Sequence, residues 1–359
     1  MTDQNNEFRR MELLESLRQR AQRFGRPMRI MEVCGTHTVA IHRSGLKDLL
    51  PPTLRLISGP GCPVCVTPAG YIDALLELGR KKNIVITTYG DMVRVKGSEY
   101  SLAEARAQGA RVQVITSAME ALKLAVGNPA LEVVFAAVGF ETTTPPTADV
   151  LIRAKCDGLT NFSTLVAHKR VIPAMEALLN APECRIDGFL CPGHVSVIIG
   201  SDAYKPIATR YQRPCVIAGF EPVQILHGLE RIATQIDRGE GRVENVYTGV
   251  VGVEPLKTAI DLMAGIFTPA DTEWRGLGSI PDSGFRIRED YERFDAVKKF
   301  GIAVRPVKEP PGCRCGQVLM GLIDPPECPL FGTRCRPEEA VGPCMVSTEG
   351  ACQAWYKYQ

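Results

Sequence analysis

Three features that this 359-residue chain lacks narrow the class of protein to which it belongs. No uninterrupted apolar run approaches the roughly 18 residues of a membrane-spanning helix, so we expect no membrane association. The first twenty residues, MTDQNNEFRRMELLESLRQR, are polar and lack the apolar stretch of a signal peptide, so we expect a cytoplasmic protein. Neither charge sign dominates, since 42 basic residues are mixed with 40 acidic ones. The sequence contains no basic stripe, so we expect no nucleic-acid binding.

The chain is rich in cysteine, with 13 residues in total. Secreted disulfide scaffolds are short, whereas this chain has enough apolar residues to form cores without disulfides. Four thiolates can hold a [4Fe–4S] cube or a structural zinc ion. The last 47 residues, which are rich in Pro and Gly, therefore predict a metal-organised module. Its six cysteines are Cys313, Cys315, Cys328, Cys335, Cys344 and Cys352.

Short apolar runs that alternate with helical segments predict an α/β fold. Runs that are apolar throughout are typical of parallel strands covered on both faces. We therefore predict two similar parallel-sheet α/β lobes that face a cleft, plus a small Cys-rich iron–sulfur module. The predicted strands are 28–33, 54–58, 84–88, 112–116, 131–138, 163–167, 186–191 and 214–218.

This pattern divides the chain into four predicted parts. Residues 1–27 form an N-terminal helix that packs on the C-terminal module. Residues 28–127 form the first lobe and 128–250 the second. Residues 251–359 contain a helical connection, with a loop at 276–285, followed by the Cys-rich module.

Chemically active side chains follow the predicted strands at the points where these strands end. In open parallel sheets, ligands bind beyond the carboxyl ends of the strands. We therefore expect these side chains to line one or two clefts between the lobes. Cys34 and His37 follow the first strand, Cys62 and Cys65 the second, Asp91 the third, Glu141 the fifth and His194 the seventh.

Each of these motifs allows more than one interpretation. The C-x-x-C pair Cys62 and Cys65 is a redox or transient metal site, half of a zinc site completed by Cys34 and His37, or inert packing. Cys34 and His37 are a nucleophile and base, soft metal ligands, or an incidental pair.

The remaining candidates are also open. Asp91 and Glu141 are acids in a cleft or caps of helix N-termini. His194 is a site residue or a structural imidazole. Four cysteines without a pairing pattern are predicted to be small apolar residues of the core or the surface. They are Cys156, Cys184, Cys191 and Cys215.

Several motifs in order resemble the HypD family of [NiFe]-hydrogenase maturation factors. They are CGTHT, GPGCPVC, YGDMVRVKGS, GFETTTP, PGHVSVIIG, GFEP and the tail CPLFG…C…GPCMVSTEGAC, from about residue 30 to the C-terminus. The resemblance implies a cytosolic scaffold, with two α/β lobes and a [4Fe–4S] cluster domain, on which the Fe(CN)2CO group is assembled. It also implies action with the small chaperone HypC and cyanide supply from HypE with HypF.

The resemblance also implies roles for individual residues. Cys34 would be the iron-ligating thiolate, with His37 as its neighbour in the cleft, and Cys62 and Cys65 the redox pair. The tail cysteines would hold the cluster. Our predicted ligands are Cys328, Cys335, Cys344 and Cys352, with Cys315 as the rival ligand and Cys313-Arg-Cys315 as a possible relay.

Two other functions compete with this interpretation. One is a thiol–disulfide reductase with a cluster relay, although a reductase needs only the C-x-x-C pair and not a separate Cys34. The other is a zinc-stabilised binding module without redox activity. Brown protein after anaerobic purification indicates iron–sulfur, whereas colourless protein that contains zinc indicates the module.

Overall fold

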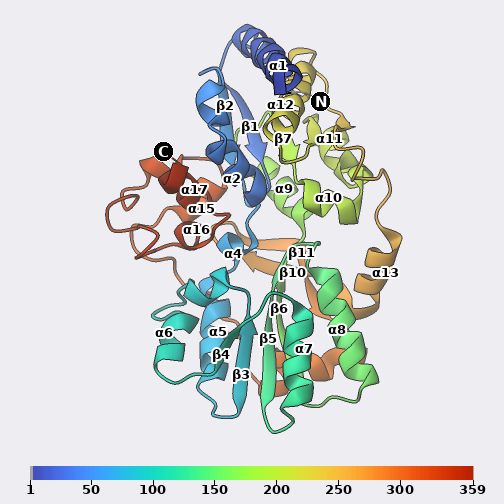
Figure 1. Ribbon diagram of the computed structural model, residues 1–359, viewed down its shortest axis with the longest axis vertical. Helices are drawn as coiled ribbons and strands as arrows, with labels where there is room; N and C mark the ends of the chain where they lie inside the picture. Colours follow the sequence, from blue (N-terminus) through green and yellow to red (C-terminus); the bar gives the residue numbers. More distant parts are fainter. Residues whose placement is uncertain (1–2, 359) are drawn as a thin grey trace.

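Two parallel sheets form the two lobes of this protein, whose computed structural model describes residues 3–358. The lobes lie at opposite ends of the molecule in Figure 1, with an antiparallel hairpin and the Cys-rich tail at the level between them. This arrangement confirms the predicted α/β class with two parallel sheets.

The strands belong to three sheets. Sheet 1 has the order β2-β1-β7-β8-β9 and sheet 2 the order β4-β3-β5-β6, while β10 and β11 form the hairpin. Sheet 1 consists of β1 (Met28–Glu32), β2 (Leu54–Ser58), β7 (Gly188–Cys191), β8 (Cys215–Ile217) and β9 (Val243–Asn245). Sheet 2 consists of β3 (Ile84–Thr88), β4 (Val112–Val114), β5 (Glu132–Gly139) and β6 (Phe162–His168). The hairpin consists of β10 (Phe267–Trp274) and β11 (Gly278–Ile287).

Helices connect the strands and cover the sheets. The first half of the chain contains α1 (Asp3–Arg23), α2 (Gly35–Arg43), α3 (Leu46–Leu49), α4 (Pro63–Val66), α5 (Ala69–Gly79), α6 (Leu102–Ala107), α7 (Ala118–Gly127), α8 (Thr144–Cys156) and α9 (Val171–Asn180). The second half contains α10 (Gly193–Ile199), α11 (Lys205–Tyr211), α12 (Pro222–Asp237), α13 (Lys257–Ile266), α14 (Ala296–Phe300), α15 (Cys315–Leu319), α16 (Pro343–Val346) and α17 (Ala351–Tyr358). Short 3₁₀ helices cover Asp91–Arg94, Ser201–Tyr204, Glu289–Phe294 and Pro325–Glu327. No helix in the described part of the chain is both long and apolar enough to cross a membrane.

The eight predicted strands all form, but they pair differently from the expected division at residues 127 and 128. Strands β1 and β2 belong to sheet 1, the chain then builds all of sheet 2, and it returns to sheet 1 with β7. Ile30 of β1 is thus in register with Gly188 of β7. The expectation of two consecutive lobes was wrong because apolar runs identify strands without specifying their partners.

The two sheets nevertheless share one topology. In each, the strand that comes first in the sequence lies between the second and the third strand of that sheet. The order in which successive strands are added to the sheet therefore reverses between β1 and β7 in sheet 1, and between β3 and β5 in sheet 2. Such a switch point opens a crevice at the carboxyl ends of the two central strands.

Strand β5 shows why its sequence is apolar throughout. Alternate side chains of a strand point to opposite faces. Val134 and Ala136 pack into one core with α5, whereas Val133 and Phe135 pack into another with α7 and α8. In Figure 1, α5 lies on one side of sheet 2 and α7 and α8 on the other. Burial on both faces fixes the position of the sheet and therefore of the loops at its carboxyl end.

The segment predicted as a loop at 276–285 is mostly the second strand of the hairpin. Residues 275–277 form its turn, in which Gly276 adopts φ 78°, a conformation that suits glycine. Strand β11 contains Pro281 and several polar residues because a two-stranded hairpin has edges on both sides, where proline is tolerated. This composition concealed the strand from the sequence analysis.

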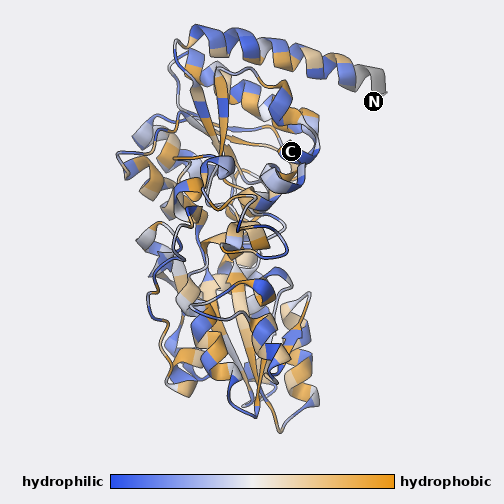
Figure 2. Cartoon of the chain, turned by 90° about the vertical axis from the view of Figure 1, so that its left-hand side faces the viewer, coloured by the Kyte–Doolittle hydropathy of each residue, from blue (hydrophilic) through white to orange (hydrophobic). Residues whose placement is uncertain are grey.

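Helix α1 packs on α12 and not, as we expected, on the C-terminal module. Leu17 is completely buried in the core that contains the α12 residues Leu226 and Leu229. Ser16 donates a hydrogen bond to Glu230 over 3.0 Å, and Arg20 pairs with Asp237 at 3.1 Å. Figure 2 shows α1 lying across the end of the molecule that holds sheet 1. The amphipathic pattern predicted the helix but could not identify its partner.

We expect Leu17→Ala to lower the free energy of unfolding by about 2–5 kcal/mol, because it leaves a cavity between α1 and α12. Urea denaturation followed by circular dichroism measures the change. The matched control is Met11→Ala on the same helix, where the side chain is 64% exposed, and it should change stability by less than about 0.5 kcal/mol. Equal effects of the two substitutions would contradict the packing of α1 on α12.

Candidate metal and redox centre

A cleft of about 690 Å³ lies where the carboxyl ends of the two sheets face each other. It is lined by residues that follow β1, β2, β3, β4, β5 and β7, and by tail residues 347–349. Both switch points of the fold therefore open into one cleft. Of the predicted cleft residues, Cys34, Asp91 and His194 line it.

Cys34 lies two residues after the end of β1 and immediately before the first residue of α2. Its backbone is extended, and its carbonyl accepts a hydrogen bond of 3.1 Å from the N–H of Thr38. Burial raises the pKa of the thiol to about 12, and the backbone N–H of His37 opposes this shift without overcoming it. Cys34 is therefore protonated at neutral pH, and a metal ion must displace that proton to bind the sulfur.

His37 is fully buried beneath the cleft and does not line it. Its Nε2 donates to the carbonyl of Gly219 at 3.0 Å, because a carbonyl can only accept, and its Nδ1 has no partner in the described residues. Burial lowers the pKa of His37 to about 4, so the ring is neutral. Phe220 lies against both His37 and His194, with ring centroids 4.8 and 4.2 Å away. His37 thus fixes the first turn of α2 behind Cys34.

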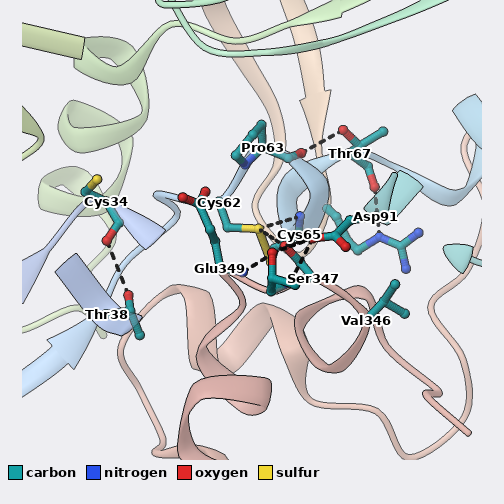
Figure 3. Close-up of a disulfide and its surroundings, with 12 residues drawn as sticks. Cys34, Thr38, Cys62, Pro63, Cys65, Thr67, Asp91, Val346, Ser347 and Glu349 are labelled. Carbon is teal, nitrogen blue, oxygen red and sulfur yellow. Dashed lines mark hydrogen bonds between the residues drawn. A yellow bond between two sulfur atoms is a disulfide. The ribbon is translucent and has the colours of Figure 1, made fainter. Parts of the chain in front are cut away.

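Cys62 and Cys65 are joined by a disulfide across the start of α4, with Cα atoms 5.3 Å apart (Figure 3). The N–H of Cys65 donates to the sulfur of Cys62 at 3.2 Å, and the hydroxyl oxygen of Ser347 lies 3.3 Å from the same sulfur. No group of three or more His, Cys, Asp or Glu side chains in residues 3–358 is arranged to hold a single metal ion. The structure therefore does not combine this pair with Cys34 and His37 into a zinc site.

The loop after β2 and the loop after β1 are in direct backbone contact. A side chain on Gly61 would collide with the backbone of Cys34, and the N–H of Gly35 donates to the carbonyl of Gly61 at 3.2 Å. Only glycine permits so close an approach. This contact sets the position of the disulfide relative to Cys34.

Tail residues 347–349 connect the loops of the two lobes, as Figure 3 shows. Asp91 accepts hydrogen bonds of 2.8 Å from both the N–H and the hydroxyl of Thr348. Glu349 accepts a hydrogen bond of 2.7 Å from the hydroxyl of Thr36. One short segment of the tail therefore touches the neighbours of Cys34, the disulfide and the acid that follows β3.

Glu141 caps a helix and does not line the cleft. Its Oε1 accepts a hydrogen bond of 2.9 Å from the N–H of Val171, the first residue of α9, and its Oε2 has no partner in the described residues. Burial raises the pKa of Glu141 to about 7. Of the two interpretations that the sequence left open for this residue, the geometry fits the cap.

A second, small cavity lies within the tail and is lined by thiols. Three of the four predicted cluster ligands line it, but Cys344 is buried behind it, next to Cys315 and Cys352. Contact with the thiols of Cys315 and Cys344 lowers the pKa of Cys352 to about 6. Convergent thiols around one small cavity fit a thiolate-bound iron–sulfur centre. The lining cysteines are Cys313, Cys315, Cys328, Cys335 and Cys352.

The tip of the hairpin connects this cavity to the disulfide. Arg275 is almost completely buried, and its N–H and Nε groups donate at 2.9 Å to the carbonyls of Val66 and Thr67, just beyond the disulfide. The next residue, Gly276, packs directly on the backbone of Gly316, which adjoins Cys315. The hairpin tip is thus in contact with both thiol regions.

Sequence reasoning missed two residues of the site. Glu32, in the last position of β1, is buried, accepts a hydrogen bond of 2.7 Å from Thr38 and has its pKa raised to about 8 by burial. A carboxylate in an apolar strand, two residues before Cys34, was the available signal. Phe220 follows β8 as Phe140 follows β5, but an aromatic residue at a strand end carries no specific signal.

A buried cleft thiol, a disulfide and a thiol-lined cavity at one junction are typical of proteins that handle metal ions or electrons. The comparisons with known proteins agree with this class. The family model described as "Hydrogenase formation hypA family" (HypD) matches residues 9–359.

Individual relatives match nearly the whole chain. It is 47% identical over 354 residues to the hydrogenase maturation factor HypD of Escherichia coli (strain K12), covering 97% of this chain and 95% of the relative. It is 48% identical over 340 residues to HypD of Azotobacter vinelandii, with 93% and 90% covered. For HypD of Cupriavidus necator the identity is 43% over 363 residues, with 98% and 96% covered. The chain therefore belongs to the HypD family, as its motifs predicted.

We expect Glu141→Gln to remove a pH dependence from stability. The folded state raises the pKa of Glu141 to about 7 from its ordinary value of 4.5, so between these values it binds a proton that the unfolded chain has released. This stabilising contribution is complete below the lower value and is lost as the pH rises through the upper one. The melting temperature of the wild type relative to Glu141→Gln should fall between about pH 5 and about pH 8. A constant difference would contradict the buried carboxyl.

Proposed function

We propose that this protein is a hydrogenase maturation factor that acts as the scaffold for assembly of the Fe(CN)2CO group, together with a HypC-type chaperone. The observation that carries the proposal is the position of Cys34, a single thiol at the switch point of sheet 1 that lines the cleft. The relatives named hydrogenase maturation factor HypD, 43–48% identical to this chain, agree with it.

Cys34 is the proposed protein ligand of the iron. Low-spin iron with cyanide and CO ligands favours a soft thiolate. Because no second cysteine among the described residues lines the cleft, Cys34 leaves coordination positions free for cyanide, CO and a partner thiolate. His37 acts as a positioning residue that holds the first turn of α2 through its bond to Gly219.

The lining of the cleft suits an iron group that carries cyanide. Among the described residues it contains several hydroxyl groups and no Lys or Arg side chain. The hydroxyl groups of Tyr89 and Thr142 form no hydrogen bond within the described residues, so they can donate to the nitrogen atoms of cyanide. The volume of about 690 Å³ leaves room for a segment of the chaperone.

We further propose that HypE, together with HypF, donates the cyanide, and that the protein is cytoplasmic.

The thiol-lined cavity is the proposed site of a [4Fe–4S] cluster. Cys328, Cys335 and Cys352 line it, as we predicted, whereas Cys344 lies behind it. Cys313 and Cys315 also line the cavity, but of these two only Cys315 contacts the buried Cys344, so we propose Cys313 as the fourth ligand. Cys315 and Cys344 then form a thiol pair beside the cluster.

These thiols lie in series between the cavity and the cleft. When bound, the cluster supplies electrons singly. Helix α16, which contains Cys344, packs on α4, which contains Cys65. Reduction of the Cys62–Cys65 disulfide takes up two electrons and two protons and yields two thiols. The hydroxyl oxygen of Ser347 lies 3.3 Å from the sulfur of Cys62, and the same hydroxyl donates to Asp91 at 3.4 Å, so Ser347 links the disulfide to the cleft. Solvent supplies the two protons.

The two rival functions account for less of this geometry. A thiol–disulfide reductase uses Cys62 and Cys65 but has no role for a separate thiol in a cleft that both sheets build. A zinc-stabilised module accounts for the thiols of the tail but has no role for the disulfide or for the separate thiol in the cleft. The protein is therefore proposed to be an assembly scaffold with redox activity.

We expect Cys34→Ala to fold normally and keep its cluster, because it removes one small side chain at the edge of the cleft. Purified anaerobically with the HypC-type chaperone, this variant should lack the infrared bands of cyanide and CO bound to iron. It should also fail to support hydrogenase maturation in cells. The control is Cys156→Ala, which removes an exposed thiol at the end of α8 and should keep both bands. Full band intensity in Cys34→Ala would show that the iron is held elsewhere.

The cluster ligands can be assigned by single serine substitutions. Serine substitution of any one proposed ligand should lower the iron content and the absorption at ~400 nm that iron–sulfur clusters give. These ligands are Cys313, Cys328, Cys335 and Cys352. Cys344→Ser should keep the iron, because Cys344 does not line the cavity, and Cys156→Ser is the exposed control. Retained iron in Cys313→Ser with loss in Cys344→Ser would return the assignment to the quartet predicted from the sequence.

A further inference from the structure

A second pocket, of about 470 Å³, lies at the amino ends of β1 and β2. The cleft lies at the carboxyl ends of the same strands, so the two sites are at opposite ends of sheet 1. The lining of this second pocket combines a wall of basic side chains and one carboxylate, that of Asp324, with an apolar part, here called its floor, formed by Leu50, Pro51, Pro52 and Leu54. The proposed scaffold function uses none of these residues. The five cationic side chains that line the pocket are Arg26, Arg29, Lys47, Arg55 and Arg185.

Only two of these five cations have carboxylate partners. Arg26 pairs with Asp187 through two hydrogen bonds. Arg55 lies 3.1 Å from Asp324 and 3.4 Å from Glu327. The other three, Arg29, Lys47 and Arg185, form no ion pair within residues 3–358. The wall therefore carries two more positive charges than the three carboxylates bonded to it can balance.

The unbalanced charges are also partly removed from water. Nε of Arg55 is buried and has no partner in the described residues. Burial, together with the nearby charge of Arg55, lowers the pKa of Arg29, and burial lowers the pKa of Lys47 to about 8. Crowded, partly desolvated cations are costly without a counter-charge. An anion in the pocket would supply that counter-charge.

The contacts that join this pocket to the tail account for only some of its five basic side chains. Arg29 donates to the carbonyl of Gly321 at 2.7 Å, and Arg55 pairs with Asp324, so both hold the Cys-rich tail against sheet 1. Arg185 donates no side-chain hydrogen bond within the described residues. The Lys47 ammonium lies over the ring of Trp355 and forms no ion pair there, although the charges of Asp324 and Asp48 act on it. These two cations are free to meet a ligand.

We propose that this pocket binds a small phosphoryl-bearing compound. A phosphoryl dianion matches the excess of two positive charges, which a single carboxylate does not. Guanidinium groups are suited to phosphate oxygens because they present paired N–H donors in one plane. The apolar floor matches an organic body attached to the phosphoryl group. Because Arg29 and Arg55 also hold the tail, a bound ligand is coupled to the segment 321–327.

The test uses isothermal titration calorimetry of the full-length protein, purified anaerobically with its metal centre, and three probes. Phenyl phosphate carries both a phosphoryl group and an apolar ring, inorganic phosphate has only the charge, and benzoate has the ring with a carboxylate. We expect phenyl phosphate to bind more tightly than benzoate. Phosphate as tight as phenyl phosphate identifies free phosphate as the ligand, whereas weaker phosphate identifies a phosphoester.

The double variant Lys47→Gln/Arg185→Gln should weaken phenyl phosphate binding by about tenfold or more, since it removes two charges from the wall. The matched control, Arg80→Gln/Lys82→Gln, removes the same charge at the amino end of β3, where another surface pocket is lined by basic residues. It should leave the affinity unchanged. Phenyl phosphate should also slow amide hydrogen exchange in residues 321–327 of the wild type.

Several results would overturn the proposal. They are no binding of phenyl phosphate, equal or tighter binding of benzoate, unchanged affinity in Lys47→Gln/Arg185→Gln, and an equal loss in the control variant. Circular dichroism and the iron content of both double variants verify that each is folded. Hydrogenase maturation does not enter the test, so its outcome is independent of the proposed scaffold function.

Discussion

The parallel pairing of β1 with β7 is the constraint on which the rest of the structure depends. Between β2 and β7 the chain leaves sheet 1, builds all of sheet 2 and returns. Because β1 then lies at a switch point, Cys34 is held at the mouth of a crevice and not beneath a helix. The same arrangement in sheet 2 brings Asp91 to the opposite wall, so one topological rule, applied twice, forms the cleft.

The elements of this fold were largely readable from the sequence, but their partners were not. All eight apolar runs form strands, and β5, which is buried on both faces after Glu132, shows the apolar pattern most clearly. Pairing depends on contacts distant in the chain, such as Ile30 with Gly188, which no local pattern encodes. The hairpin was missed because β11 contains Pro281 and its exposed and buried positions do not alternate regularly. Helix α1 was recognised from its periodicity, although its partner α12 was not.

In the site too, the sequence predicted which residues lie at strand ends but not which of them face one another. Strand ends predicted Cys34, Asp91 and His194, and these residues do line the cleft. Spacing could not separate a cleft acid from a cap, and the bond from Val171 assigns Glu141 to the second role. Spacing also could not rank six nearby cysteines, because side-chain direction within an irregular tail depends on packing. The cysteine that the cavity excludes, Cys344, is the one carried by the short helix α16.

The tail couples the two chemical regions through its order along the chain. Residues 347–349, which touch Asp91, Thr36 and Cys62, lie between Cys344 and Cys352. Cys344 is packed behind the thiol-lined cavity and Cys352 lines it, so whatever orders the cavity fixes both ends of this segment. A short segment anchored at both ends has little freedom to move. The order of the cleft wall beside Cys34 therefore depends in part on the order of the cysteine cavity, which makes the cavity part of the structure that forms the cleft.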